Sequence, residues 1–234
     1  MHASFVSAFR VRCLVVLGLS GLLAPVALSA QATRYPLTST ASLRPHNVIA
    51  EPATFQGKKG LKVMAAAESA AGNEELVLIT DLEFGDGVIE VEIAGGVRPG
   101  SAEGARGFVG VAFRVQNDLR TYDAFYLRPT HGRADDQVRR NHAVQYISHP
   151  DWTWSRLRQE FPGKYESYGD LLPATWTRVK IEVRGQRAWL YLHDMEQPTL
   201  IVNDLKSGAH AKGAVALWIG PGTIAHFRNL RVSQ

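Results

Sequence analysis

The feature that most constrains the fold is an alternating stretch at residues 176–194, WTRVKIEVRGQRAWLYLHD. Val179, Ile181 and Val183 alternate with charged residues, which is the pattern of a strand with one buried and one solvent-facing side. Gly185 and the glutamine after it then favour a tight turn into a second strand. The sequence therefore predicts an antiparallel hairpin in this stretch.

Short runs of the same kind recur along the chain, separated by Gly, Asn, Asp or Pro residues that favour turns. No stretch has the 3.6-residue period of a full helix, and residues 155–161 are expected to form only a short helical turn that Pro162-Gly163 ends. About a dozen short strands at regular spacing predict an all-β fold, an antiparallel β-sandwich of the jelly-roll type. The other expected strands are 46–51, 60–66, 75–80, 87–93, 108–115, 124–129, 198–205, 213–220 and 224–232.

The N-terminal segment departs from this pattern. Arg10 and Arg12 precede an apolar run at 13–28, and Ala30-Gln31-Ala32 offers a small-residue cleavage site. These are the three parts of a secretory signal peptide, which we assign to residues 1–32. The apolar run is short for a membrane span, which needs about 20 residues, so a retained membrane anchor is the weaker alternative.

Removing this segment changes both the cysteine content and the charge. The single cysteine, Cys13, lies within it, and an exported chain without disulfides favours a secreted or periplasmic protein of the bacterial cell envelope. The formal charge falls from +4 to +2, because two arginines and no acidic residues are removed. That mild balance indicates neither a nucleic-acid partner nor a membrane partner after signal cleavage. The rest of the chain is expected to be an exposed lead-in at 33–46 and one domain at 47–234.

A long polar segment at 128–168 is the main candidate for a functional site, because loops of this length inside a compact domain are more often functional than idle. Its arginines and amides could bond to sugar hydroxyls, and its tryptophans could stack on sugar rings. Equally, the tryptophans could cover the core and the arginines could pair with nearby acids. The candidate ligand-binding residues are Arg128, Arg133, Gln137, Arg139, Arg140, Asn141, Gln145, Tyr146, Trp152 and Trp154.

Acid–base chemistry has candidates in two places. Glu90 and Glu92 stand two positions apart on an expected strand, so both point to one face and could flank a glycosidic bond. The same alternation also fits an ordinary solvent-facing strand side, which we favour. Within the long segment, the candidate catalytic residues are His131, Asp136, His142 and Glu166.

Metal and nucleophile signatures are weak. The histidines and aspartates of the long segment match no compact metal-binding spacing, so we expect no metal and no cofactor. Calcium bound through Asp135 and Asp136 is a weak alternative. Nucleophilic hydrolysis has no support, because the chain has no G-x-S-x-G motif and no cysteine beyond residue 13.

The last five expected strands carry a family resemblance. A tryptophan opens a lysine-alternating strand, a glycine hairpin and a strand ending in Asp follow, and then come GAVALW and the closing FRNLRV. In this order the chain resembles the concanavalin A-like lectin/glucanase superfamily, in its laminin-G-like and 3-keto-disaccharide-hydrolase-like branches. The resemblance covers most of residues 47–234 and implies a jelly roll. The matching residues are Trp176, Gly185, Asp194, Gly213, Trp218, Phe227, Asn229 and Val232.

This superfamily hosts lectins, glycosidases, adhesion modules and inert domains, so the resemblance alone selects no function. We expect a secreted, carbohydrate-recognising, lectin-like domain whose partner is a carbohydrate or small glycoside bound at 128–168. One alternative is a glycoside-active enzyme, a glycosidase or a 3-keto-glycoside hydrolase or lyase. The strand at 90–94 holds two of the three acids that glycoside hydrolase family 16 carries in its E-x-D-x-E strand. The other alternative is a structural envelope domain that binds a protein partner.

Overall fold

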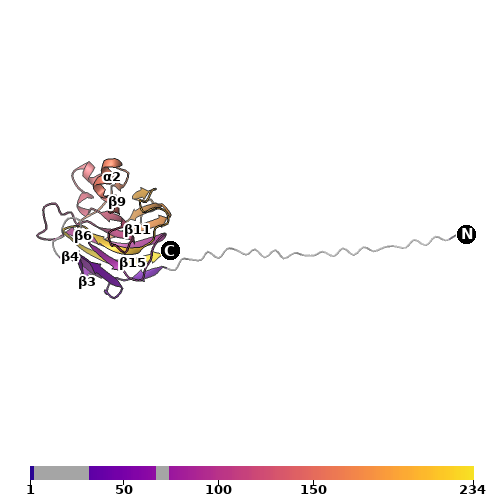
Figure 1. Ribbon diagram of the computed structural model, residues 1–234, viewed down its shortest axis with the longest axis horizontal. Coiled ribbons are helices and arrows are strands. Elements are labelled where there is room, and N and C mark those ends of the chain that lie inside the picture. The colour runs from indigo at the N-terminus through magenta and orange to yellow at the C-terminus, as the bar shows by residue number, and fades with distance from the viewer. Residues whose placement is uncertain (3–31, 67–73) are drawn as a thin grey trace.

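A computed structural model describes residues 1–2, 32–66 and 74–234. The signal-peptide assignment falls almost wholly on residues outside this description and stays a prediction. In the described part, two antiparallel sheets pack face to face as a sandwich (Figure 1). The expected all-β antiparallel sandwich is therefore confirmed.

Sheet A has the strand order β13-β12-β11-β6-β15-β4-β3, with β1 pairing on β15. Its long central strands are β6 and β15, which pair over most of their length. The strands of sheet A are β1 (Thr33–Tyr35), β3 (Val48–Phe55), β4 (Lys58–Ala65), β6 (Gly87–Val97), β11 (Thr177–Arg184), β12 (Arg187–Leu192), β13 (Leu200–Val202) and β15 (Thr223–Ser233).

Sheet B has the strand order β10-β9-β8-β7-β14-β5-β2. Its strands are β2 (Leu43–His46), β5 (Leu76–Ile79), β7 (Val109–Val115), β8 (Tyr122–Leu127), β9 (Val144–His149), β10 (Glu166–Ser167) and β14 (Ala214–Ile219). Three short helices accompany it: η1 (Pro129–His131), α1 (Gln137–Asn141) and α2 (Trp154–Glu160). The short α2 confirms the helical turn expected at 155–161.

The hydrophobic core lies between the two sheets. On β6, Ile89, Val91 and Ile93 are buried, because alternate residues of a strand point to the same face. The sheets approach closely at Gly95, where an added Cβ would lie 2.6 Å from the Cγ1 atom of Val109 on the facing sheet. Val109 therefore points inward from sheet B, and this fixes which side of sheet B faces the core.

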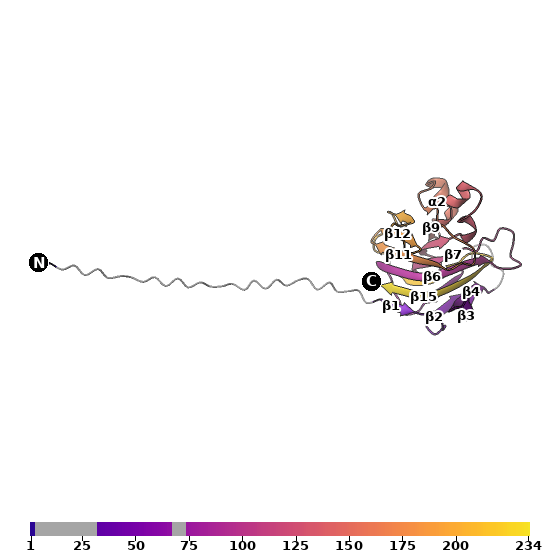
Figure 2. The same ribbon diagram turned by 180° about the vertical axis from the view of Figure 1, so that it is seen from behind.

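The segment 33–46, expected as an exposed lead-in, is largely exposed but belongs to the sandwich. Strand β1 pairs with β15 of sheet A, and β2 pairs with β5 of sheet B. Between them, Leu37 is buried in the core. Seen from behind, β1, β2 and β3 lie along one border of the molecule (Figure 2). This segment therefore supplies the edge strand β2 of sheet B and the strand β1 beside β15 in sheet A, so it is part of the sandwich.

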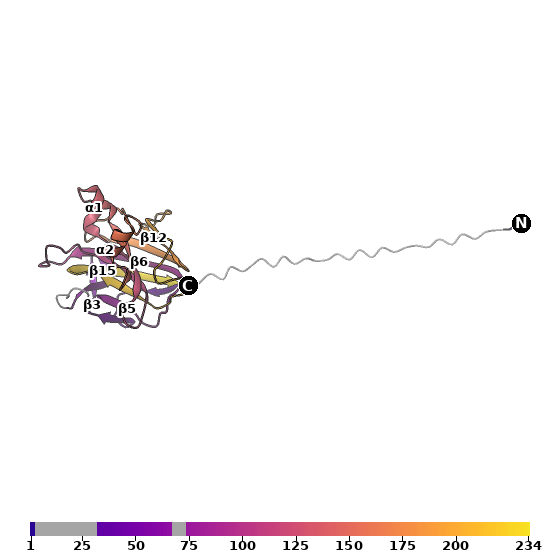
Figure 3. The same cartoon turned by 45° about the horizontal axis from the view of Figure 1, so that its top comes forward.

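The segment 128–168 is not one long loop. Strand β9 lies in its middle and pairs with β8 along six register positions, Tyr122↔His149 to Leu127↔Val144. The helices η1 and α1 precede β9, and α2 follows it; Figure 3 shows α1 projecting from the body of the fold. The sequence did not predict β9, because its residues are buried on both faces and show no alternation.

None of the described helices is long and apolar enough to cross a membrane.

Candidate functional site

A row of side chains crosses the face of sheet B that points away from sheet A. The strand register places Glu166 of β10 opposite Gln145 of β9, Gln145 opposite Tyr126 of β8, and Tyr126 opposite Gly110 of β7. Because Val109 points inward, its neighbour Gly110 and the whole row point outward. Three residues from different strands are thus brought together on the outer face of sheet B.

Small residues in the centre of sheet B make room for large rings on this outer face. Ala112, Ala124 and Ala216 occupy the adjacent row of paired positions. Above them, the Nε1–H group of Trp218 on β14 donates a hydrogen bond of 3.0 Å to the hydroxyl of Tyr122 on β8, so these side chains together bridge the intervening strand β7. The outer face of sheet B is therefore covered by its own aromatic layer, unlike a simple solvent-facing strand side.

The carboxylate of Glu166 is the centre of a buried ionic cluster. Arg158 binds it with two groups, Nε at 3.0 Å from Oε1 and Nη2 at 2.7 Å from Oε2. The Nε2 atom of His142 lies 3.1 Å from Oε1, and Nη1 of Arg128 lies 3.8 Å from Oε2. The side chain of Glu166 is only 3% exposed. We call Tyr126, Arg128, His142, Gln145, Arg158 and Glu166 the Glu166 cluster.

Arg128 connects this cluster to the strands below it. Its Nη2 group donates to the hydroxyl of Tyr126 at 2.6 Å and to Oε1 of Gln145 at 3.1 Å. Its Nη1 group donates to the backbone carbonyl of His142 at 2.9 Å. The guanidinium also lies 5.5 Å from the ring centre of Phe108 and 5.0 Å from that of Tyr126. Arg128 is thus fixed by hydrogen bonds and aromatic faces at once.

Helix α2 places an exposed tryptophan beside the cluster. The hydroxyl of Thr153 accepts from the backbone N–H of Arg156 and caps the helix. Trp154 and Arg158 stand four positions apart and share a face, while Leu157 points into the core. The Arg158 guanidinium lies 5.0 Å from the Trp154 ring centre. Trp154 is 47% exposed, so an apolar ring and a fixed guanidinium meet at the surface.

The charges of the cluster do not cancel. Two arginines face the one carboxylate of Glu166, which leaves one surplus positive charge. Burial lowers the pKa of His142 below its ordinary value; Glu166 offsets part of this effect, and Arg158 and Arg128 reinforce it. The imidazole is therefore neutral at pH 7. The side chains of Arg158 and His142 are both partly exposed. The cluster therefore presents to solvent the N–H donors of Arg158 and the neutral imidazole of His142.

The structure brings together five of the sequence-predicted site residues of the segment 128–168. They are Arg128, His142, Gln145, Glu166 and Trp154. Sequence reasoning missed Tyr126, Phe108 and Arg158. Tyr126 and Phe108 lie in runs expected only as strands, and Arg158 in one expected only as a helical turn. The i,i+4 spacing of Trp154 and Arg158 was the available signal.

Two predicted binding residues do not belong to this site. The side chain of Tyr146 points into the core, where its hydroxyl donates to Asp123 at 2.7 Å, so it does not reach the outer face of sheet B. Tyr146 neighbours Gln145 on β9, and successive strand residues point to opposite faces. Trp152 does not face the same way as Trp154; its ring centre lies 3.9 Å from the guanidinium of Arg156 and 4.7 Å from Nζ of Lys206.

The residues of α1 stabilise the helix itself. Asp136, a candidate catalytic residue, is the N-cap and accepts from the backbone N–H of Arg139 at 2.7 Å. Gln137 donates to Asn141 at 2.7 Å across one helical turn. Arg139 is exposed on the same helix. These four predicted residues therefore lie beside the Glu166 cluster rather than in it.

The remaining predicted residues have local partners. Arg133 forms an exposed two-point ion pair with Asp170, at 2.8 and 3.1 Å. The Arg140 guanidinium lies 5.2 Å from the ring centre of Tyr168. His131 packs edge-on against Phe108, with ring centres 6.4 Å apart. Burial, followed by the nearby Arg128, lowers the pKa of His131 to about 4, so it is neutral at pH 7.

Glu90 and Glu92 lie on the outer face of sheet A and point away from the Glu166 cluster, with the whole sandwich between them. Glu90 pairs with Arg231 at 3.4 Å. Glu92 pairs with Arg228 at 3.4 Å and Lys58 at 3.5 Å. They therefore do not share a groove with the residues of 128–168. Their charges are balanced by neighbours on the same surface. This arrangement agrees with the favoured interpretation of Glu90 and Glu92 as the solvent-facing side of a strand.

Across residues 1–2, 32–66 and 74–234, no three His, Cys, Asp or Glu residues are grouped so that they could hold a metal ion. Asp136, half of the weak calcium alternative, uses a carboxylate oxygen to cap α1. The expectation of no cofactor stays a prediction.

Solved structures share this fold. Carbohydrate-binding module CBM66 from Bacillus subtilis aligns with a TM-score of 0.57 and 15% identity, over 82% of this chain and 96% of that one. The fold is concanavalin A-like. A Bacillus subtilis protein of unknown function with a galectin-like fold aligns with a TM-score of 0.53 and 14% identity, over 86% of this chain and 94% of that one.

A protein from Parabacteroides distasonis, provisionally named a glycosyl hydrolase, aligns with a TM-score of 0.52 and 12% identity, over 86% of this chain and 99% of that one. No family model and no curated protein sequence matches the chain. The superfamily resemblance is therefore confirmed at the level of the fold, whereas the laminin-G-like and 3-keto-disaccharide-hydrolase-like branches stay predictions.

Proposed function

We propose that this protein is an exported carbohydrate-binding domain whose site is the exposed face of Trp154 together with Arg158 and His142. The observation that carries the proposal is an indole, 47% exposed, beside donors that a buried carboxylate holds in place. An aromatic face can stack on a sugar ring, while fixed planar donors bond its hydroxyls. Because Arg158 is already ordered by Glu166, little side-chain entropy is lost on binding.

The likeness to CBM66 supports the choice of ligand class, because that protein's name describes it as a carbohydrate-binding module. Export rests on the signal-peptide pattern of residues 1–32. We therefore place the protein among secreted or periplasmic proteins of a bacterial cell envelope, with a carbohydrate or small glycoside as its partner.

A glycoside-active enzyme has less support from the geometry. Both oxygens of Glu166 are engaged by Arg158, and Oε1 also faces His142, which leaves this carboxylate poorly placed to protonate a leaving group. Glu90 and Glu92 point away on the other sheet. Protein docking at the exposed Trp154 is the remaining alternative, and the experiment below separates it from glycan binding.

The test is isothermal calorimetry and a glycan array with the full chain and two tryptophan variants. Trp154→Ala is expected to weaken oligosaccharide binding by about thirtyfold or more, as for a central aromatic contact. Trp189→Ala is the matched control, because Trp189 also lies beside two arginines, Arg184 and Arg187, but on sheet A. Absence of binding to any oligosaccharide, or equal loss in both variants, would overturn the proposal.

A further inference from the structure

A pocket of about 560 Å³ opens at the opposite end of β8 from the Glu166 cluster. It lies where β7 turns into β8 and where β9 ends. Tyr122 and His149, paired at this end of the two strands, form one wall. Lys206 and Ser207, which follow β13, lie on another side. Arg114, Asp151, Trp152 and Lys212 also line it.

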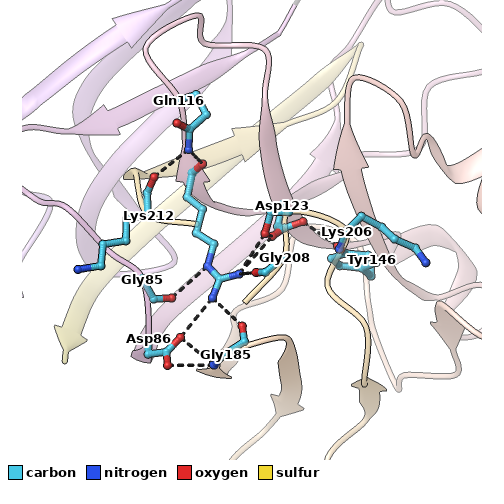
Figure 4. A network of polar contacts seen from close by, with 11 residues as sticks. Gly85, Asp86, Gln116, Asp123, Tyr146, Gly185, Lys206, Gly208 and Lys212 are labelled. Carbon is cyan, nitrogen blue, oxygen red and sulfur yellow. Dashed lines mark hydrogen bonds and ion pairs between the residues drawn. The ribbon is translucent and has the colours of Figure 1, made fainter. Parts of the chain in front are cut away.

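The floor of this pocket is a closed hydrogen-bond network around Arg114, which is completely buried. Its partners are drawn in Figure 4, where the amino group of Lys212 points away from the network. Asp123, also buried, accepts from Tyr146 and Ser207 and lies 4.0 Å from Arg114. Arg114 donates to the carbonyls of Gly85, Gly185 and Gly208, to Ser207 Oγ and to Asp86. The floor is thus rigid, and its polar groups are already satisfied.

The wall differs, because it holds an imidazole with a fixed orientation. Nδ1 of His149 lies 2.9 Å from Oε1 of Glu74 and 3.0 Å from the hydroxyl of Tyr122. The Tyr122 hydroxyl accepts from Nε1–H of Trp218 and has one proton, which it donates to Oε2 of Glu74. Burial raises the pKa of Tyr122 well above its ordinary value, so this proton stays in place. The contact between Nδ1 and Oε1 therefore needs the proton on Nδ1.

This assignment leaves Nε2 of His149 as a hydrogen-bond acceptor. The side chain is 21% exposed, and no described residue bonds to its Nε2 atom. A carboxylate behind an imidazole fixes its tautomer and its orientation. The pocket therefore offers one oriented acceptor on its wall, above a floor with no free donor.

We propose that this pocket binds a neutral, monosaccharide-sized polyol, with a ligand hydroxyl donating to Nε2 of His149. The volume is in the range of small-molecule sites. A neutral ligand fits because two of the lining cations already have acidic partners: Arg114 pairs with Asp86 and Asp123, and Lys206 pairs with Asp204 at 3.0 Å. The other two charged lining residues, Lys212 and Asp151, carry opposite charges. Trp152, half-buried at the rim, gives an aromatic edge to the ring of such a ligand. The pocket is separate from Trp154 and does not rest on the proposed function.

The full chain labelled with ¹⁵N at its five tryptophan indoles provides the test. Glucose, galactose, mannose, fructose and inositol are each titrated, alongside a polymer ending in the same sugar, and the indole N–H signals are followed by NMR. Because Trp218 Nε1–H donates to Tyr122, binding at His149 is expected to shift the Trp218 signal. Binding at the other site shifts Trp154 instead, so each proposal can fail alone. The free sugars and the polymer distinguish a free ligand from a chain terminus.

Three variants make the test specific. His149→Phe removes the acceptor and is expected to abolish the Trp218 shift, or to weaken affinity by about tenfold or more. His149→Gln, whose amide oxygen can accept a hydrogen bond, is expected to retain part of the binding and covers the case in which His149→Phe fails to fold. His210→Phe, an exposed histidine near the pocket, is the control. A Trp218 signal that no sugar moves, or that still moves in His149→Phe, overturns the proposal.

Discussion

The outer faces of the two sheets differ in how they place charged side chains. On sheet A, charged side chains point to solvent and pair across neighbouring strands, as Glu90 does with Arg231 and Glu92 with Arg228. On sheet B, rings cover the strands, and the carboxylate of Glu166 beside them is 3% exposed. Exposed pairs are worth little, because water screens them. A buried carboxylate with two arginines holds its neighbours in place, because Arg128 left without it would be a buried, unpaired charge.

The largest expected effect is on Glu166. Glu166→Ala leaves Arg128 buried without its carboxylate and is expected to lower the free energy of unfolding by about 3 to 5 kcal/mol. Glu92→Ala on sheet A is the matched change and is expected to cost less than about 1 kcal/mol. Urea denaturation of both variants measures the difference. Similar losses in the two variants would show that the sheets do not differ in this way.

This difference also explains what the sequence could and could not predict. On β11, Val179, Ile181 and Val183 alternate with charged residues, because one face of the strand meets water. The sequence therefore predicted both the strand and which of its faces is buried. On β8, the run YDAFYL is buried on both faces, and no alternation marks its outer side. The number and spacing of the expected strands predicted the jelly roll, but they did not predict the aromatic layer on sheet B.

The candidate site was predictable in composition and not in geometry. Arginines, tryptophans and a glutamate in 128–168 indicated that the segment mattered. Whether Gln145 or Tyr146 joins the site depends on which face of β9 each occupies, and β9 was not expected as a strand. The meeting of Arg128 with Glu166 depends on the pairing of β8, β9 and β10, which is a long-range property of the sheet.

A smaller effect is expected from His131, which packs edge-on against Phe108. Its pKa is about 4 in the folded protein and about 6.5 in the unfolded chain. As pH falls from 6.5 to 4, the unfolded chain takes up this proton first, so stability is complete above pH 6.5 and declines below it. The expected loss over this window is roughly 1 to 2 kcal/mol after allowance for solvent screening.

The variant His131→Gln is expected to flatten the pH dependence between 6.5 and 4, measured by urea denaturation at several pH values. His226 on the outer face of sheet A is the comparison, because burial against Phe55 and the charge of Lys62 lower its pKa in the same direction. We expect His226→Gln to flatten the curve less. An unchanged slope in His131→Gln would show that this histidine is not the group that titrates.

The smallest effect is expected from the two acids of sheet A. The double variant Glu90→Gln with Glu92→Gln is expected to change the free energy of unfolding by no more than about 1 kcal/mol, because both are partly exposed pairs. Oligosaccharide binding should also be unchanged, since these side chains point away from Trp154 with the sandwich between them. Calorimetry with the ligand that wild type binds checks this. A loss of binding, or of any glycoside cleavage that the wild type shows, would indicate that the functional surface lies on sheet A and not on sheet B.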